Sequence, residues 1–286
     1  MSIMNKASRP VRRLPRECRF SELQEGYMGI PILLYHALYD RESNRERYSI
    51  RKEAFEDQMR YLSETGVQSL LLDEFFSIQQ ASERERKKIA ITFDDGNESD
   101  YSIALPILKK YGLKATFFIT VERISKNNYL SWSQLMKMND HGMSIQSHGL
   151  THAFLNCLTE GDAQRELLES KQEIQGRLGT EVNYFSLPGG FSSPFVLDLV
   201  EEAGYQGVCT SGPGLNLPGP GGEGLRIFKR MNMTKRISLG NFQRAAGGKR
   251  GYVARRRAED LLKNGFKRVL GSNAYYSIWS KFFKYD

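Results

Sequence analysis

The sequence predicts an α/β protein whose mainly parallel sheet is surrounded by helices. Strand-like and helical segments alternate about seven times along the 286 residues, a pattern typical of parallel sheets with crossover helices. Candidate functional residues stand at or near the ends of predicted strands, at His36, Asp94, Asp95, His148 and Pro188. Because active residues of such folds gather at the carboxyl ends of strands, these positions indicate a functional site.

Each element follows from its local pattern. In 50–66, for example, Phe55, Met59 and Leu62 recur at helical spacing, and Gly66 ends the segment. The expected strands are 29–38, 67–72, 88–93, 114–120, 143–148, 182–190, 207–210 and 225–231. The expected helices are 50–66, 74–80, 100–112, 132–142, 159–179, 194–205, 258–271 and 274–283. The Gly- and Pro-rich segment 212–224 is expected to be a surface loop, because its G-x-G-x-x-G match lacks a leading strand.

Composition bounds the location and the partners. There is no apolar run of 18 residues and no apolar stretch typical of a secretory signal near the start. The three cysteines are far apart in sequence, which favours free thiols in a reducing compartment. We therefore expect a cytoplasmic protein. Between Arg244 and Asp286, eleven Lys and Arg face three Asp and Glu, a surplus that equals the net charge of +8.

Two adjacent carboxylates end the predicted strand 88–93, in the stretch "ITFDDG". One interpretation is a solvated turn, because Asp and Gly are common turn residues. The other is a metal site in which Asp95 binds the ion while Asp94 serves as the general base. A nearby cation would keep both carboxylates ionised and offset their repulsion.

A second motif, "SHGLTH", places His148 and His152 within five residues in a chain with only four histidines. The pair could simply be two surface or core histidines. Two imidazoles and one carboxylate are, however, a donor set that suits a catalytic transition metal and leaves positions for water and substrate. The two motifs together favour the metal site.

These motifs resemble a known family. "TFDDG" at 92–96 and "SHGLTH" at 147–152, in this order and about fifty residues apart, are similar to those of the polysaccharide deacetylases of the NodB-homology type, also called carbohydrate esterase family 4. The stretches "PILLYHAL" and "FEDQMRYLSETG" resemble the branch that deacetylates poly-N-acetylglucosamine-like exopolysaccharides. The resemblance spans about residues 28 to 235 and implies a distorted (β/α)7 barrel, here with a basic helical extension.

The resemblance also implies roles for individual residues. It makes Asp94 the base and Asp95, His148 and His152 the ligands of one divalent ion, with Zn as the default and Co or Ni as alternatives. "FSLPGG" at 185–190 stands where the family has Arg-x-Pro-aromatic-Gly. Ser186 therefore replaces the Arg that orients the base, and Gly189 replaces the aromatic residue but keeps the backbone N–H of an oxyanion hole. Pro188 and Gly190 would line the substrate site.

The proton donor departs from the common family pattern as well. No histidine follows His152, whereas most members have a later one that protonates the leaving amine. His36, in "LLYHAL", matches the early histidine with which the exopolysaccharide branch fills this role. His141 is expected only to end the helix 132–142.

The sequence thus predicts a metal-dependent enzyme that removes N-acetyl groups from N-acetylhexosamine units of a polysaccharide or a lipid-linked glycan precursor. The alternative is a catalytically impaired glycan-binding barrel of the same fold. The predicted organisation is a basic lead-in (1–27), the catalytic barrel (28–240) and a basic amphipathic tail (241–286). The tail carries aromatic residues at 275, 276, 279, 282 and 283, so we expect it to contact anionic membrane at the inner face. A single short basic patch makes nucleic acid an unlikely partner.

Overall fold

The structure is a computed structural model that describes residues 29–40, 48–78, 88–219 and 224–270. The predicted lead-in and the predicted helix 274–283 lie outside these residues. The strands are β1 (Ile30–Tyr35), β2 (Leu38–Tyr39), β3 (Ile50–Arg51), β4 (Gln68–Leu70), β5 (Lys88–Phe93), β6 (Thr116–Ile119), β7 (Ser144–Ser147), β8 (Tyr184–Ser186), β9 (Gly207–Cys209), β10 (Leu215–Asn216), β11 (Arg226–Phe228) and β12 (Met231–Asn232). The helices are α1 (Lys52–Glu64), α2 (Glu74–Ser77), α3 (Leu105–Lys110), α4 (Trp132–Asp140), α5 (Glu160–Leu178), α6 (Pro194–Glu202), α7 (Leu239–Ala246) and α8 (Arg250–Leu270). Short 3₁₀ turns are η3 (Val121–Arg123), η4 (Leu155–Cys157) and η5 (Pro188–Gly190).

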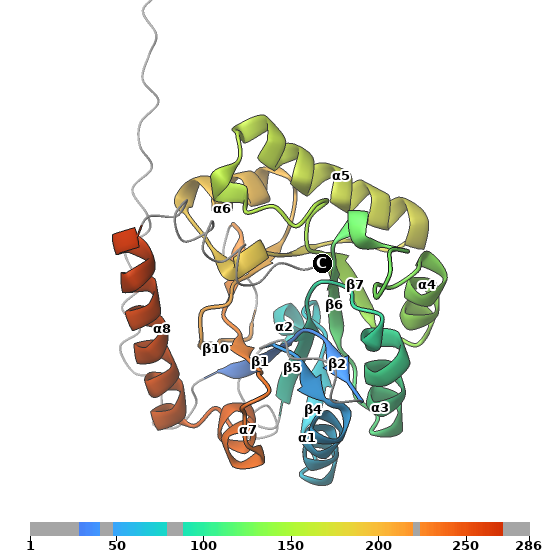
Figure 1. The fold of residues 1–286 in the computed structure, drawn as a ribbon, viewed down its shortest axis with the longest axis vertical. Helices are drawn as coiled ribbons and strands as arrows, with labels where there is room; N and C mark the ends of the chain where they lie inside the picture. The colour runs from blue at the N-terminus through green and yellow to red at the C-terminus, as the bar shows by residue number, and fades with distance from the viewer. Residues whose placement is uncertain (1–28, 41–47, 79–87, 220–223, 271–286) are drawn as a thin grey trace, which may run out of the picture.

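The strands form a nearly closed barrel surrounded by helices (Figure 1). The sheet runs β10-β1-β5-β6-β7-β8-β9-β11, and every neighbouring pair from β1 to β11 is parallel. All carboxyl ends of these strands therefore open at one mouth. The predicted α/β class with a barrel-shaped sheet is confirmed.

The barrel closes through an interrupted strand. β11 pairs with β9, and two residues later β12 pairs in parallel with β1, Leu33 opposite Met231. The single strand predicted for 225–231 is therefore wrong in its continuity. The break has a physical reason: the chain must change partner from β9 to β1, and the residue at the break, Arg230, carries its side chain into the protein with no solvent exposure.

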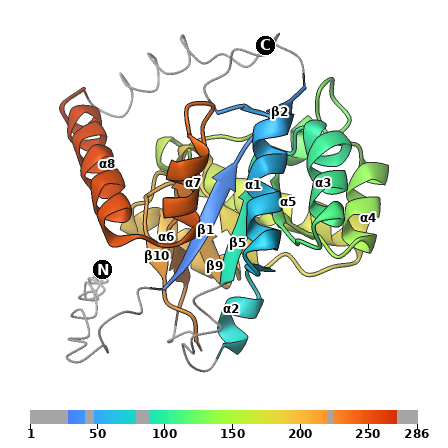
Figure 2. The same ribbon diagram turned by 90° about the horizontal axis from the view of Figure 1, so that it is seen from below.

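The barrel interior is layered, because alternate side chains of each strand point inward. The lower layer is apolar, and its members from the barrel strands are Ile30, Ile32, Ala90, Phe118, Tyr184, Cys209 and Phe228. Phe75 of α2 belongs to the same cluster and packs edge-on against Phe228, with ring centroids 5.4 Å apart; Figure 2 shows α2 below the sheet. One step further along the strands, the inward positions are polar: Thr92, Asp94, His148, Ser186 and Arg230 are all buried. The site thus lies above an apolar floor.

The larger core lies between the outer face of the sheet and the helices. It includes the start of the basic extension: Phe242 of α7 packs edge-on against Tyr61 of α1, and Tyr252 and Val253 of α8 are buried. Further along α8, Leu261 and Leu262 are exposed, at 71% and 70%. Among the described residues, no helix is long and apolar enough to cross a membrane.

Two local predictions need correction. The helix expected for 100–112 begins as a π-helical turn, Asp100–Ala104, and becomes α-helical only from Leu105. Pro106 has no N–H to donate to the preceding turn, which accounts for the wider start. The segment 212–224 is not only loop, because β10 within it pairs antiparallel with the beginning of β1.

Candidate active site

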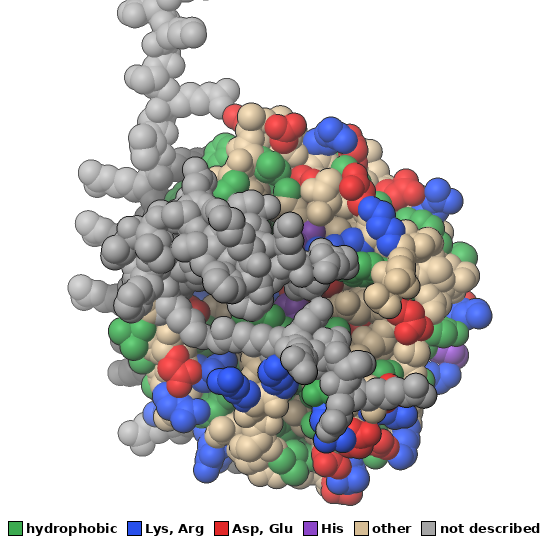
Figure 3. Space-filling model, viewed as in Figure 1, with side chains coloured by type: hydrophobic (Ala, Val, Ile, Leu, Met, Phe, Trp, Pro, Cys, Tyr) green, Lys and Arg blue, Asp and Glu red, His purple; other side chains and the backbone are tan. Residues whose placement is uncertain are grey.

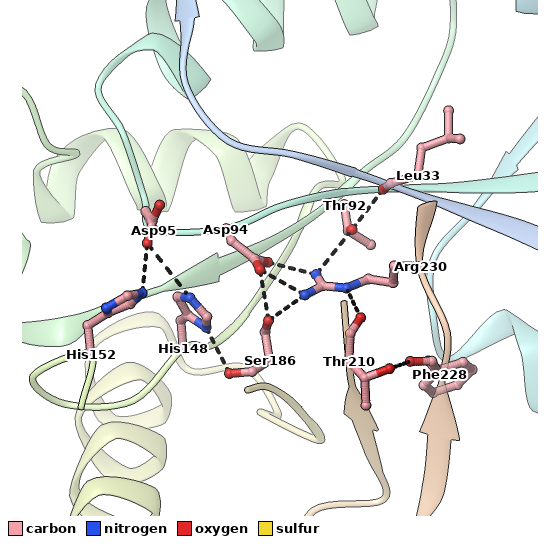
Figure 4. Close-up of polar contacts among 10 residues, drawn as sticks. All are labelled: Leu33, Thr92, Asp94, Asp95, His148, His152, Ser186, Thr210, Phe228 and Arg230. Carbon is pink, nitrogen blue, oxygen red and sulfur yellow. Dashed lines mark hydrogen bonds and ion pairs between the residues drawn. The ribbon is translucent and has the colours of Figure 1, made fainter. Parts of the chain in front are cut away.

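The two adjacent aspartates leave the end of β5 at the barrel mouth. Each is only 3% exposed, so the solvated-turn interpretation is wrong. The backbone N–H of Asp94 donates to the carbonyl of Tyr35 at 3.0 Å, which continues the β1–β5 pairing. Asp95 then adopts a positive φ of 81°, a conformation that Asp tolerates better than most residues. The chain turns at this point, and the two carboxylates point to different partners (Figure 4).

Asp95, His148 and His152 form a compact cluster. One ligand atom from each residue can be chosen so that all lie within 4.8 Å of one another. Asp95 Oδ1 lies 3.2 Å from His152 Nε2 and 3.7 Å from His148 Nε2. The structure therefore brings together the three residues that the sequence predicted as metal ligands. Two imidazole nitrogens and a carboxylate oxygen on one small space fit a divalent transition metal.

The hydrogen bonding of His148 prepares it as a ligand. Its Nδ1 lies 2.8 Å from the carbonyl oxygen of Ser186. A carbonyl can only accept, so Nδ1 carries the hydrogen and the lone pair of Nε2 faces the cluster. Burial lowers the pKa of His148 from 6.5 to about 4, with Asp94 opposing the shift. The imidazole is thus neutral near pH 7, as a metal ligand must be.

Besides the two histidines, Asp95 has a cationic neighbour that the sequence analysis did not identify. Arg123, from η3, donates from Nη1 to Asp95 Oδ1 at 2.9 Å. Burial raises the pKa of Asp95, but the hydrogen bond from His152 and the surrounding histidines hold it well below its usual value of 3.8. Arg123 and His152 are the more accessible members, with side chains 16% and 12% exposed. In Figure 3, His side chains reach the surface near the middle of the face, beside Lys or Arg.

Asp94 is held by a buried guanidinium. Arg230 Nη1 and Nη2 donate to the two carboxylate oxygens of Asp94 at 2.7 and 2.8 Å. The hydroxyl of Ser186 also donates to Asp94 Oδ2, at 2.9 Å, and accepts from Arg230 Nη2 at 2.8 Å. The remaining donors of Arg230 reach the carbonyl of Thr210 at 3.0 Å and the hydroxyl of Thr92 at 3.4 Å. All five N–H groups of this buried guanidinium are therefore paired (Figure 4).

This network answers the question raised by Ser186. The sequence motif lacks the expected Arg, yet Arg230 supplies a guanidinium to the same carboxylate from the break between β11 and β12. Burial raises the pKa of Asp94, but Arg230 together with His148 and His36 outweighs that effect and leaves the pKa below 3.8. Sequence reasoning missed Arg230 because it read 225–231 as one strand. The sequence did contain a signal: Phe228 faces the barrel interior, so Arg230, two residues later, occupies the next inward position, where a cation is unusual.

His36 lies at the same mouth as the aspartates. Tyr35 pairs with Phe93, so His36 and Asp94 follow neighbouring positions at the ends of adjacent parallel strands. His36 is an even number of residues from Ile30 and Ile32, whose side chains face the barrel interior, so it continues the inward-facing positions of β1. Its Nδ1 is buried, and the described residues provide no hydrogen-bond partner for it. Burial lowers the pKa of His36 from 6.5, while Asp95 and Asp94 raise it again in part.

The turn after β8 carries the other predicted residues. Pro188 is buried and begins η5, and Gly189 and Gly190 have positive φ values of 68° and 72°. A Cβ on Gly189 would lie 2.9 Å from the ring of Phe191 and 3.0 Å from that of Phe154, so no larger residue fits here. The N–H of Gly190 donates to the carbonyl of Leu187 at 2.8 Å. The roles of Gly189, Pro188 and Gly190 toward substrate stay predictions.

His141 behaves as expected from its sequence context. It is the C-cap residue of α4, and its Nε2 lies 3.1 Å from Lys109 Nζ on the protein exterior. His141 therefore lies outside the cluster, and its substitution is a suitable control for substitutions of the other three histidines.

Active sites of β/α barrels lie at the carboxyl ends of the strands, and the buried polar layer of this protein lies there, so the chain has the organisation of a barrel enzyme. Residues 81–208 match the family model described as "Polysaccharide deacetylase". This segment of the chain is therefore similar to that family, and the resemblance predicted from its two motifs is confirmed over these residues.

Relatives and solved structures agree with this assignment. The Bacillus subtilis protein YxkH, a predicted polysaccharide deacetylase, is 36% identical over 186 residues, which cover 65% of each chain. The poly-beta-1,6-N-acetyl-D-glucosamine N-deacetylase of Staphylococcus epidermidis is 28% identical over 51% of this chain and 52% of its own. The match thus spans between about half and two thirds of these relatives. The Streptococcus pyogenes deacetylase PplD, solved with acetate, superposes with a TM-score of 0.69 at 23% identity, over 76% of this chain and 98% of that one, and supports the fold.

Proposed function

We propose that this protein is a metal-dependent N-deacetylase that hydrolyses the acetamide of N-acetylhexosamine units in a polysaccharide or a lipid-linked glycan precursor and releases acetate. One observation carries the proposal: two adjacent buried aspartates are given separate partners. Asp95 faces His148 and His152, while both oxygens of Asp94 are bound by Arg230. This is the division of labour that a metal ligand beside a general base requires.

Asp95, His148 and His152 would hold one divalent ion, with zinc as the first choice and cobalt or nickel as alternatives. When bound, it would supply Lewis acidity and lower the pKa of water. The donor set fits because His148 presents Nε2 and Asp95 is ionised. Metal identity stays open among these three ions.

The chain's own residues would move the protons. Asp94, which is ionised and fixed in orientation, would accept one proton of the attacking water. The oxygen of that water bonds to the acetamide carbon, and the C–N bond then breaks. His36 would give a proton to the departing nitrogen, since an amine leaves poorly as an anion. The backbone N–H of Gly189 would stabilise the negative charge on the carbonyl oxygen. The products are acetate and a free amino sugar.

The glycan substrate rests on the match to the family model and on the names of relatives, one of which is a poly-beta-1,6-N-acetyl-D-glucosamine N-deacetylase. The alternative, an impaired glycan-binding barrel, was suggested by the missing Arg of the "FSLPGG" motif. Arg230 removes that ground, because the base is held after all.

The test is acetate release from acetylated chito-oligosaccharides, β-1,6-linked N-acetylglucosamine oligomers and lipid-linked N-acetylhexosamine, with detection by mass. We expect release from at least one substrate, loss on chelation and recovery with Zn or Co. His148→Ala should abolish release, and His141→Ala, on the exterior, should leave it unchanged. Binding of the oligomers without any acetate release would establish the glycan-binding alternative.

We propose further that the basic extension contacts anionic membrane. On α8, Arg255 is exposed and Leu261 and Leu262 present apolar side chains to solvent. Basic residues near an anionic surface contribute about 1 kcal/mol each. Removing 244–286 would also remove the buried Ala245, Ala246, Tyr252 and Val253, so point changes are the better test. The cytoplasmic location stays a prediction.

Leu261→Ser combined with Leu262→Ser should weaken binding to vesicles that contain phosphatidylserine. The control is Leu168→Ser, which changes an exposed leucine on α5. Salt should weaken the binding of the unchanged protein. Equal binding by the double variant and the control would reject this role for α8.

A further inference from the structure

The loop that carries both histidine ligands is irregular and needs support. Between β7 and η4 the chain forms neither helix nor strand. Gly149 and His152 have positive φ values of 88° and 71°. For a residue other than glycine, this conformation costs roughly 1 kcal/mol or more and persists only where the surroundings impose it. Some feature of the protein must therefore hold His152 in place.

Glu166, in the second turn of α5, provides that support. Its Oε2 accepts the backbone N–H of Leu150 at 2.8 Å and that of Thr151 at 3.0 Å. Its Oε1 accepts the hydroxyl of Thr151. Only 6% of Glu166 is exposed, although a carboxylate is seldom buried without a purpose that compensates its desolvation. The residue contacts the loop between the two ligands and neither imidazole.

Other backbone groups of the loop are bonded to different segments. The carbonyls of Gly149 and Leu150 accept the backbone N–H groups of Val121 and Glu122, at 3.1 and 2.9 Å. The N–H of Gly149 donates to the Ser147 hydroxyl at 3.1 Å. The loop is therefore bonded to both η3 and α5, and Glu166 accepts the N–H groups of Leu150 and Thr151.

A second contact ties the same helix to the start of the loop. The hydroxyls of Ser170 and Ser147 lie 2.8 Å apart, and Ser170 also donates to the carbonyl of Glu166 at 2.6 Å. Gly149 completes the fit, since a Cβ at that position would lie 2.9 Å from Glu166 Oε2. The helix α5 and the His-x-x-x-His loop thus pack closely and are joined by several hydrogen bonds.

We propose that Glu166 is a positioning residue that fixes the His148–His152 loop in its metal-binding geometry and thereby sets the affinity for the metal. The inference rests on the metal site of the proposed function. A carboxylate suits this position because two of its three partners are backbone N–H groups and an ionised carboxylate only accepts. Glutamine keeps the size but loses the charge: its oxygen would accept the two N–H groups more weakly while its NH₂ group turned toward the Thr151 hydroxyl. Supporting groups behind ligands typically change metal affinity by about 10–100-fold.

The test compares Glu166→Gln with Glu169→Gln. Glu169 is exposed on the same helix and, among the described residues, pairs with Arg165, so it controls for a lost charge on α5. Zinc dissociation constants come from competition with a chromophoric chelator. The visible spectrum of the cobalt-loaded protein reports ligand geometry, which a merely structural residue would not alter. We expect Glu166→Gln to weaken zinc binding 10–100-fold and to change the cobalt spectrum, while Glu169→Gln matches the unchanged protein. An unchanged affinity and spectrum in Glu166→Gln would overturn the proposal.

Thr151→Val covers the case in which Glu166→Gln fails to fold. It removes one of the three donors and leaves both backbone bonds. We expect a smaller weakening of zinc binding, of several-fold, with a shifted cobalt spectrum; no change in either would reject the role of Glu166. If the unchanged protein binds zinc but releases no acetate, the proposed function fails while the role of Glu166 stands. If it binds no divalent metal, both fail.

Discussion

Asp94 and Asp95 are neighbours in the chain and equally buried, yet their surroundings differ in kind. Asp94 meets a complete network, in which one guanidinium has all five N–H groups paired and satisfies both carboxylate oxygens. Asp95 shares a single oxygen, Oδ1, among His148, His152 and Arg123. Each carboxylate thus has a guanidinium neighbour, but only Asp94 has both oxygens bound by one. Asp95 Oδ1 also lies beside the Nε2 atoms of His148 and His152. The difference teaches that side chains alone fix the orientation of Asp94, whereas the cluster around Asp95 offers the donor atoms that the proposed metal ion would join.

Exchanging the carboxylates for amides should separate the two roles most strongly. Asp94→Asn should keep the metal, because it leaves the cluster untouched, and should lower turnover by roughly 10²–10⁴-fold, the usual worth of a general base. Asp95→Asn should lose most of its metal affinity and turnover together, since an amide is a much poorer ligand. Metal content by mass spectrometry and acetate release measure the two effects. Reversed phenotypes would exchange the roles.

Removing the cation of Asp94 should affect stability more than metal binding. Arg230→Met leaves a buried carboxylate without its partner, which typically costs about 3–5 kcal/mol in the free energy of unfolding. The double variant Arg230→Met with Asp94→Asn should lose less free energy of unfolding than the sum of the two single losses, because the residues act as a pair. Urea unfolding of the four proteins gives the coupling energy. Zinc affinity should change little, and an equal loss in affinity and stability would deny that the two halves of the site are independent.

Sequence patterns sufficed for the α/β class and for one half of the site, while the family resemblance implied the barrel. The strand 88–93 and the helix 159–179 were predicted almost to the residue. Each has a single, uninterrupted hydrophobic pattern, and residues typical of strand or helix ends stand on either side of it. Asp95, His148 and His152 were found because their motifs are local. Local motifs require no knowledge of which strand lies next to which.

The other half of the site depends on long-range pairing. Arg230 reaches Asp94 across 136 residues of sequence, and only the change of strand partner between β11 and β12 brings it there. Glu166 was not singled out within the predicted helix 159–179, because nothing in the neighbouring sequence reveals the loop that it contacts. Such residues are visible only when the register of the sheet is known.

The pH dependence of stability should also distinguish the two halves. In metal-free protein His148 takes up a proton near pH 4 when folded and near 6.5 when unfolded. Between these values the unfolded state binds more protons than the folded state. The contribution of His148 to the free energy of unfolding is therefore fully present above pH 6.5, and it falls by about 3 kcal/mol as the pH drops toward 4. The depressed pKa values of Asp94 and Asp95 add losses only at lower pH, below 3.8.

Urea unfolding of chelator-treated protein at several pH values measures this loss. His148→Asn should make the curve less steep between pH 6.5 and 4, although burial also lowers the pKa of His36 and so preserves part of the slope. His141→Asn, on the exterior, should leave the curve unchanged. Saturating zinc should delay the loss to lower pH, because the ion competes with the proton for Nε2. A curve that is unaffected by His148→Asn would assign the pH dependence to other groups.

The smallest expected effect concerns His36, whose role lies with Asp94 rather than with the ligands. A proton donor matters when the leaving group is an amine and not when it is a stable phenolate. His36→Gln should therefore slow acetamide hydrolysis by about 10²-fold and leave hydrolysis of 4-nitrophenyl acetate within a few-fold, with zinc affinity unchanged. Because burial lowers the pKa of His36 from 6.5 and a donor must be protonated, amide turnover should decline as the pH rises through that lowered value.

The ratio of amide to ester turnover is the decisive quantity, because it cancels any general loss of folded protein or of metal. His141→Gln should keep the ratio of the unchanged protein. An equal loss on both substrates would mean that His36 supports the site without donating the proton, and no loss on either would place the donor elsewhere. A loss confined to the amide would extend the comparison of the two aspartates, since the end of β1 would then complete the proton-transfer half of the site, beside the strand that carries Asp94.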